Sequence, residues 1–383
     1  MRFITAGLII LFCGLALSVF VWPQDTIRFE STRVQKMVLC LEDKQIPCRW
    51  VGNYNHELGM PIFNYIAPLP YYVGGLLYFV TRDLELVTKI LYLLPGVVIL
   101  LLVGYVLNFR QNKVLFGSVA MVIIVGLYWY LVGGVKLNLG ICWFLGCLLL
   151  VVFSLSRLSK TPTIRSMLIL TTSGVLFLLS DISAVYIYAI GVILVSIYVG
   201  LKRRNKLTLL FATSFFLTVG VAAFYIFPMV IESDLVRQNA INEEYLPVSV
   251  RSVPGDEILP EVSVLVGSAD IFGYEERTNR FRFGIENNDH TIVRLAIPYY
   301  PNWTIKANGE RVNNYYENNS LGLITLIFGE GRFVVEGKLE DTPVREISNI
   351  VSGVTMVLVL FLLFSEMGHI RNGVAYYLKA LHS

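Results

Sequence analysis

The chain has 383 residues, of which 55% are hydrophobic and only 15% are charged, and its mean hydropathy is +0.63. Soluble domains carry about 25% charged residues, so the composition excludes an ordinary soluble protein and predicts an integral membrane protein. The net charge is only +3, there is no basic stripe, and the four histidines are scattered. Nothing therefore suggests a nucleic-acid partner or a histidine-rich metal site.

Apolar runs long enough to cross about 30 Å of hydrocarbon recur along the chain. The first follows Arg2 and resembles a signal peptide, but its length and the lack of a clean cleavage site favour an uncleaved span. The predicted spans lie at roughly 3–22, 86–108, 114–134, 138–156, 166–181, 183–201, 208–230 and 349–366.

The orientation follows from the basic residues in the short loops. Lys and Arg cluster at 109–113, 157–165 and 202–206, in alternate loops. Such loops face the cytoplasm, so both termini are predicted to be cytoplasmic, with 23–85 and 231–348 on the other side. The sequence therefore predicts a multi-pass plasma-membrane protein with about eight spans.

The segment 59–72 reads GMPIFNYIAPLPYY and is too apolar and aromatic for a solvated loop. Its three prolines disfavour a regular helix within the run. Counting 62–80 as a crossing would also place Arg2 outside. We therefore expect a juxtamembrane or re-entrant helix there, with aromatic rings at the membrane surface.

Two cysteines of the same loop, Cys40 and Cys48, could form a disulfide if the loop faces an oxidising compartment. Two nearby cysteines are a weak signal on their own, so free thiols remain the alternative.

The second extracytoplasmic segment alternates apolar and polar residues over 280–340. Asn308-Gly309 is a strong hairpin signal, and 329–331 marks another turn. We expect an antiparallel β-sandwich of about 100 residues. The predicted division is a transmembrane domain over 1–230, with its loop and juxtamembrane helix at 23–85, a sandwich over 231–348, and a final span and tail over 349–383.

Several charged residues are expected at the extracytoplasmic membrane face. Asp25 follows the first span, and Glu30 and Arg33 continue on an amphipathic helix; Glu57, Lys89 and Asp181 are the others. A carboxylate there could act as a general base or, at Asp25, hold Mg²⁺ or Mn²⁺, and a cation could bind a lipid-linked phosphate. The alternative is that these residues simply end helices in water. Asp181 stands out because a tight turn between spans holds it.

The 59–72 run resembles a pattern of the YfhO-like family of bacterial and archaeal membrane proteins, GYPLFNFYPPLPYY. Other motifs of that family have counterparts in the same order: RVQKM at 33–37, QIPCRW at 45–50, AFYIFPM at 223–229, YYPNW at 299–303 and TPVR at 342–345. The similarity covers nearly the whole chain. The family in turn is similar to the GT-C class of membrane glycosyltransferases.

The resemblance implies a GT-C-like core that uses a polyprenyl-phosphate sugar on the extracytoplasmic side. It implies that Asp25 is the base or cation ligand and that Arg33 and Lys89 contact the donor phosphate. Asp181 and Glu30 are further catalytic candidates because of their expected place at the membrane face, although the family pattern has histidine at both positions. The donor and acceptor site would include Arg33, Arg49, Trp50, Glu57, Asn64, Tyr65, Tyr71, Tyr72 and Lys89.

Two functions follow as hypotheses. The first is transfer of a sugar to an envelope glycan or polymer. The second is a non-catalytic membrane protein of the same fold that binds or scaffolds envelope glycans or lipid carriers. The chain is shorter than the family pattern between Pro228 and the sandwich, so a membrane-protein partner could supply the absent helices.

Overall fold

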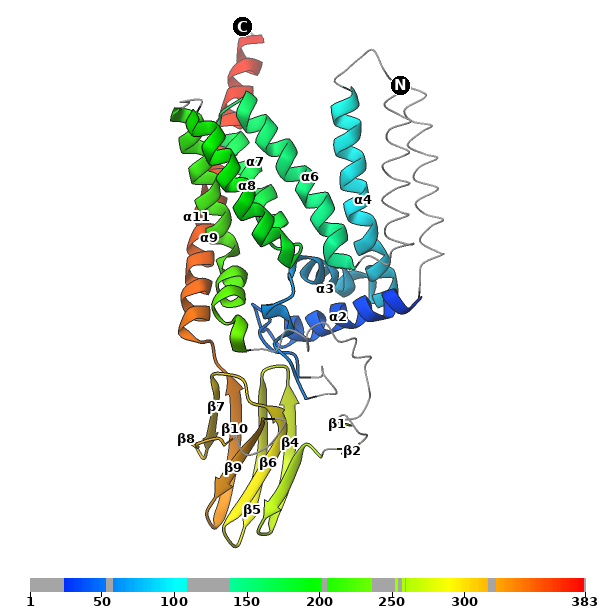
Figure 1. Ribbon diagram of the computed structural model, residues 1–383, viewed down its shortest axis with the longest axis vertical. Helices are drawn as coiled ribbons and strands as arrows, with labels where there is room; N and C mark the ends of the chain where they lie inside the picture. The colour runs from blue at the N-terminus through cyan, green and yellow to red at the C-terminus, as the bar shows by residue number, and fades with distance from the viewer. Residues whose placement is uncertain are drawn as a thin grey trace. The chain divides into compact units, whose positions relative to one another are not determined.

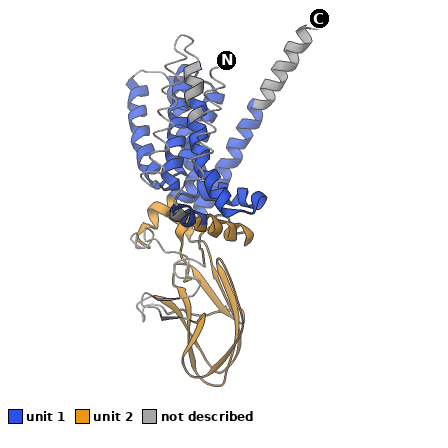
Figure 2. Ribbon diagram, turned by 90° about the vertical axis from the view of Figure 1, so that its right-hand side faces the viewer, with its two compact units in different colours: residues 1–31, 67–226, 347–383 blue, residues 32–66, 227–346 orange. Residues whose placement is uncertain are grey.

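The computed structural model describes residues 24–52, 58–108, 138–201, 205–235, 252–253, 257–258, 260–315 and 322–381. The expected spans at 3–22 and 114–134, and the candidate Glu57, lie outside the described residues. The chain divides into two compact units (Figure 2). We call residues 1–31, 67–226 and 347–383 the helical unit, and residues 32–66 and 227–346 the sheet unit.

The helical unit is built from long apolar helices, several of which run side by side in Figure 1. Helix α6 packs against α4 and α7, α7 against α8, and α3 against α4. The helices are α3 (Leu69–Thr81), α4 (Leu84–Asn108), α6 (Leu139–Lys160), α7 (Ile164–Leu178), α8 (Ile182–Leu201), α9 (Asn205–Ile231) and α11 (Pro343–Leu381), the ends of α9 and α11 extending into the sheet unit.

In the described part of the chain, four helices are long and apolar enough to cross a membrane. They are α6, α8, α9 and the Pro343–Glu366 part of α11. The structure therefore supports membrane insertion, while the count of about eight spans and the orientation of the termini stay predictions.

Two expected membrane segments are short helices. Helix α7 has 15 residues, about 22 Å of rise, where the sequence predicted a span over 166–181. Helix α3 has 13 residues, about 20 Å. Both are apolar but shorter than the about 30 Å of a hydrocarbon core, and for α3 this agrees with the expected juxtamembrane position.

The proline-rich run contains more helix than the sequence suggested. Pro61 precedes the short 3-10 helix η2 (Ile62–Asn64), Pro68 is the N-cap of α3, and Pro70 lies in the first turn of α3. The first turn of a helix tolerates proline because its amide hydrogens have no partner within the helix. The prolines therefore mark where α3 begins.

Helices α9 and α11 approach closely at a serine. The Ser352 hydroxyl accepts a hydrogen bond from the Phe224 amide (2.8 Å) and donates to the Gly220 carbonyl (3.2 Å). A Cβ atom on Gly220 would lie 2.6 Å from Thr355 Oγ1, so only glycine fits this contact. A polar side chain inserted into a helix in this way fixes the packing of two apolar helices.

The sheet unit contains two main antiparallel sheets. Their orders are β4-β5-β10-β7-β8 and β3-β6-β9, and β1 pairs with β2 in a separate short ladder. The strands are β1 (Ser252–Val253), β2 (Glu257–Ile258), β3 (Val262–Val266), β4 (Ala269–Arg277), β5 (Arg280–Asn287), β6 (Thr291–Pro298), β7 (Trp303–Ala307), β8 (Glu310–Arg311), β9 (Leu323–Phe328) and β10 (Gly331–Leu339); the 3-10 helix η3 (Ser233–Leu235) precedes them.

The two main sheets share one hydrophobic core, so the expected antiparallel β domain is confirmed. Buried side chains from β5 and β10 of one sheet meet those of β6 and β9 of the other, including Phe283, Val335, Leu295 and Leu326. The hairpin expected at Asn308-Gly309 is also confirmed: it joins β7 to β8, and both residues have positive φ.

Residues 32–66 belong to the sheet unit, whereas the sequence division placed them with the transmembrane domain. Helix α2 (Gln24–Glu42) begins in the helical unit and continues into this segment. The physical reason is that Trp50 is only 3% exposed and completes the core of the two sheets. Trp50 thus attaches the segment 32–66 to the hydrophobic core of the β domain.

Candidate functional site

Glu30 is enclosed in the helical unit, with 1% of its surface exposed, whereas Asp181 is half-buried. Its Oε2 accepts a hydrogen bond from the Tyr71 hydroxyl of α3 (2.9 Å). Its Oε1 accepts one from the Leu139 amide in the first turn of α6 (3.4 Å). A carboxylate at a helix N-terminus is favourable, because the free amides and the helix dipole both favour negative charge. Glu30 therefore joins α2, α3 and α6.

Asp181 lies at the same end of α6. It stands in the turn between α7 and α8, where its Oδ1 accepts a hydrogen bond from the Ser183 amide (2.9 Å). A Cβ atom on Gly140 would lie 2.7 Å from Asp181 Oδ2, so the carboxylate occupies the space that this glycine leaves. Because Leu139 and Gly140 are neighbours, Glu30 and Asp181 meet the same helical turn.

Asp25 is in the first turn of α2, and its side chain lies outside the described residues. It lies five positions before Glu30, which is about 7.5 Å along the helix axis. We call Glu30 and Asp181, which meet the first turn of α6, the acidic cluster. The place of the Asp25 side chain beside them and the chemical roles of all three acids stay predictions.

Two other candidates of the helical unit have different surroundings. Lys89 forms an ion pair with Glu85 on its own helix, α4 (2.6 Å). Tyr72 is partly buried on α3, beside Tyr71. The expected convergence of Lys89 with the acids on one cleft stays a prediction.

The described residues contain no group of three metal-ligating side chains. In the acidic cluster, both oxygens of Glu30 accept hydrogen bonds from protein groups. A divalent cation at Asp25 stays a prediction.

The substrate-binding candidates of the sheet unit form an internal polar network. Arg49 donates to Asn64 Oδ1 (3.0 Å), and Asn64 Nδ2 reaches the Tyr300 hydroxyl (3.4 Å). The Tyr65 and Tyr300 hydroxyls are 3.1 Å apart, and Tyr65 donates to the Glu232 carbonyl (2.7 Å). All five residues are buried. We call this set, with Thr342 and Arg345, the junction network.

The junction network ends in a buried ion pair. Arg345 has no exposed surface, and its Nε and Nη2 each lie 2.8 Å from Glu232 Oε2. The Thr342 hydroxyl donates to Glu232 Oε1, and the Arg345 guanidinium lies 4.7 Å from the centre of the Tyr300 ring. The network thus connects the segment 32–66 and the β6–β7 connection with Glu232, which follows α9, and with the start of α11.

Tyr65 is held as a neutral hydrogen-bond donor. Burial raises the pKa of its hydroxyl well above the ordinary value, and the neighbouring Tyr300 and Glu232 raise it further, against a lowering by Arg345. Its proton therefore stays on the oxygen that donates to the Glu232 carbonyl.

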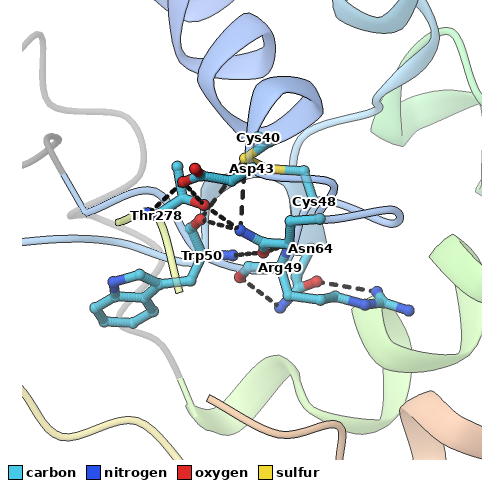
Figure 3. The surroundings of a disulfide bond; sticks show 8 residues. Cys40, Asp43, Cys48, Arg49, Trp50, Asn64 and Thr278 are labelled. Carbon is cyan, nitrogen blue, oxygen red and sulfur yellow. Dashed lines mark hydrogen bonds between the residues drawn. A yellow bond between two sulfur atoms is a disulfide. The ribbon is translucent and has the colours of Figure 1, made fainter. Parts of the chain in front are cut away.

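A disulfide closes the loop at the end of α2. Cys40 and Cys48 are bonded, which decides the alternative that the sequence left open (Figure 3). Inside the loop, the Gln45 side-chain amide donates hydrogen bonds to the Trp50 carbonyl (3.0 Å) and to the Thr278 hydroxyl (2.9 Å). Asp43 accepts two hydrogen bonds from Thr278, each 2.8 Å. The loop is thereby attached to the β4–β5 turn.

Trp50 and Arg33 are also interior residues. The Trp50 ring packs against Tyr300 and Trp303, with centroid distances of 5.7 and 5.8 Å. Arg33 is buried on the part of α2 that belongs to the sheet unit. With this burial, Trp50 supports the fold directly, and a contact with substrate would require the core to open.

Sequence reasoning did not select Glu232, Tyr300 or Arg345 as important residues. A signal existed for two of them, because Tyr300 lies in the YYPNW motif and Arg345 in TPVR. Glu232 stands alone after the apolar end of α9, and only the fold shows that it meets Arg345.

Each unit carries a surface groove. In the helical unit, an apolar groove of about 380 Å³ is lined by residues of α6, α8 and α9 from Val152 onward. Val152 is 13 residues, or about 20 Å, from the start of α6, so this groove does not reach the acidic cluster. In the sheet unit, a groove of about 470 Å³ lies on the five-stranded sheet and is lined mostly by charged residues.

Comparison of the chain with known protein families, with curated protein sequences and with solved structures finds no match.

Proposed function

We propose that the helical unit acts as a membrane glycosyltransferase of the GT-C kind. It would transfer a sugar from a polyprenyl-phosphate donor to an envelope glycan or polymer on the extracytoplasmic face. The observation that supports the proposal is the acidic cluster, in which α2 and the α7–α8 turn bring the carboxylates of Glu30 and Asp181 to the first turn of α6.

The three acids would have different tasks. Glu30 accepts two hydrogen bonds and is enclosed, so it positions α2 against α3 and α6. Asp25, in the first turn of the same helix, is the candidate general base for the acceptor hydroxyl. Asp181 is half-buried and has one oxygen directed toward Gly140, which suits a second polar contact with the acceptor.

The proposal is tested by replacing Asp25 with Asn in a cell whose own gene is deleted. We expect loss of the sugar from the envelope polymer while the protein level in the membrane is unchanged. The matched control is Glu42→Gln, an exposed acid on the same helix, which should retain the modification. Full modification in cells that carry both Asp25→Asn and Asp181→Asn would contradict the proposal.

A non-catalytic binding protein is the second candidate, and the junction network favours it. Residues of four family-like motifs, Arg49, Asn64, Tyr300 and Arg345, are buried against one another and serve the fold. Their presence therefore does not require a substrate site. In this case the envelope would lose organisation only when the whole protein is removed, and single acid replacements would have no effect.

A further inference from the structure

Three cations stand in one row across the five-stranded sheet. Arg277 of β4 is directly opposite Arg280 of β5, and Arg280 is directly opposite Lys338 of β10. Directly paired residues point to the same face, and neighbouring strands are about 4.8 Å apart. The row, which we call the cationic row, therefore presents three positive charges over about 10 Å of exposed surface.

The neighbouring row shows what an ordinary solvated face looks like. It runs Glu275, Arg282, Glu336 and Lys306 across β4, β5, β10 and β7, with alternating charge. Arg282 and Glu336 form an ion pair of 3.5 Å within it. In contrast, like charges directly opposite each other destabilise a sheet. The cationic row thus departs from the pattern of its neighbour at a cost in stability.

Few carboxylates compensate the cationic row. Arg277 has Asp43 at 3.4 Å. Among the described residues, Arg280 and Lys338 form no ion pair within 4.0 Å. Glu340, which lines the same groove, accepts a hydrogen bond from Thr304. The groove of about 470 Å³ lies over both rows and is lined by five cationic and three acidic side chains. It is hollow and carries net positive charge.

We infer that the cationic row binds a linear polyanion whose charged groups are phosphates. Guanidinium groups bind phosphate oxygens through two parallel hydrogen bonds, and the lysine adds a point charge. Charges spaced at about 5 Å across three strands suit a chain with repeating phosphates better than a single ion. This binding is separate from sugar transfer, so either property can be present without the other.

The test uses the full-length protein in nanodiscs of neutral phosphatidylcholine, titrated with fluorescently labelled long-chain inorganic polyphosphate. We expect Arg280→Gln and Lys338→Gln each to weaken binding on the order of fivefold and to reduce its salt dependence. The matched control is Arg332→Gln. Arg332 lies on β10, the strand of Lys338, and on the same face of the sheet. It pairs with Glu286 and does not line the groove. Its loss changes the net charge equally and should have little effect.

A stability measurement gives a second readout. Without polyphosphate, Arg280→Gln should leave the melting temperature unchanged or raise it, because it removes a repulsive pair. The inference is overturned if Arg332→Gln weakens binding as much as Arg280→Gln, or if orthophosphate binds as tightly per molecule as the chain. It is also overturned if only nanodiscs with anionic lipid, or only double-stranded nucleic acid, show binding that depends on Arg280.

Discussion

At the scale of single residues, Arg345 and Glu232 form a buried ion pair that includes the Thr342 hydroxyl. Removing one partner of such a pair leaves an uncompensated charge away from water. We expect Glu232→Gln to lower the free energy of unfolding by about 3–5 kcal/mol, measured as thermal unfolding of the purified protein in detergent. The control Glu346→Gln changes an exposed acid on α11 and should have little effect. Equal losses in the two variants would contradict a structural role for the pair.

The raised pKa of Tyr65 predicts a pH dependence. Above pH about 10, the unfolded chain loses the phenolic proton while the folded protein keeps it, so the unfolded state binds fewer protons and stability falls as pH rises. The contribution of Tyr65 to the free energy of unfolding is fully present below that pH. Tyr65→Phe should flatten the alkaline part of the stability profile while losing about 1 kcal/mol at neutral pH with the hydrogen bond. An unchanged alkaline slope in the variant would count against this assignment.

The acidic cluster shows what residue-level reasoning can and cannot predict. The sequence indicated Asp25 and Asp181 because each lies at the end of an apolar run. It could not indicate that Glu30 is enclosed by Tyr71 and the Leu139 amide, because those partners are about 40 and 110 residues away. Burial and partners of a polar side chain depend on tertiary packing, which no local pattern encodes.

At the scale of elements, the loop at the end of α2 is closed by a disulfide and attached to the β4–β5 turn by Gln45. The bond between Cys40 and Cys48 joins the end of α2 to the residues that lead to Trp50. Replacing both cysteines with serine should lower the free energy of unfolding by roughly 2–3 kcal/mol, because the unfolded loop regains freedom. Thermal unfolding with and without reductant checks this: the wild type should lose stability on reduction and the double variant should not. A reductant effect of equal size in both proteins would contradict it.

Sequence patterns predicted strands better than helix ends. The alternation over 280–340 predicted β5 and β7, because side chains of a half-buried strand alternate with period two. The Asn308-Gly309 turn predicted the β7–β8 hairpin. The short helix expected at 62–80 begins only at Leu69, because Pro68 and Pro70 lie in the cap and first turn of α3. The order of strands was also not predictable, since β5 pairs with β10 across about 50 residues.

At the scale of the whole molecule, the distribution of basic loops predicts that the β domain faces away from the cytoplasm. A single cysteine at Asp289, in the exposed β5–β6 turn, should react with a membrane-impermeant maleimide in intact cells. A cysteine at Lys160, at the end of α6, should react only after permeabilisation. The opposite pattern would reverse the orientation and move the acidic cluster to the cytoplasmic side.

The division of the chain into units was only partly accessible from the sequence. Composition separated apolar helices from the alternating strands, but residues 32–66 looked like part of a membrane loop. Their membership in the sheet unit depends on Trp50 entering the core and on Asp43 and Gln45 bonding Thr278. These contacts join positions more than 200 residues apart.

Sugar transfer by the helical unit is measured most directly with purified protein in liposomes. A polyprenyl-phosphate sugar with a radiolabelled sugar and an envelope polymer extract are added to wild-type protein, Asp25→Asn and Glu42→Gln. We expect label in the polymer fraction with wild type and Glu42→Gln, and a loss of on the order of 100-fold with Asp25→Asn, as for removal of a general base. Equal transfer by Asp25→Asn and wild type, or none by any of the three, would contradict it.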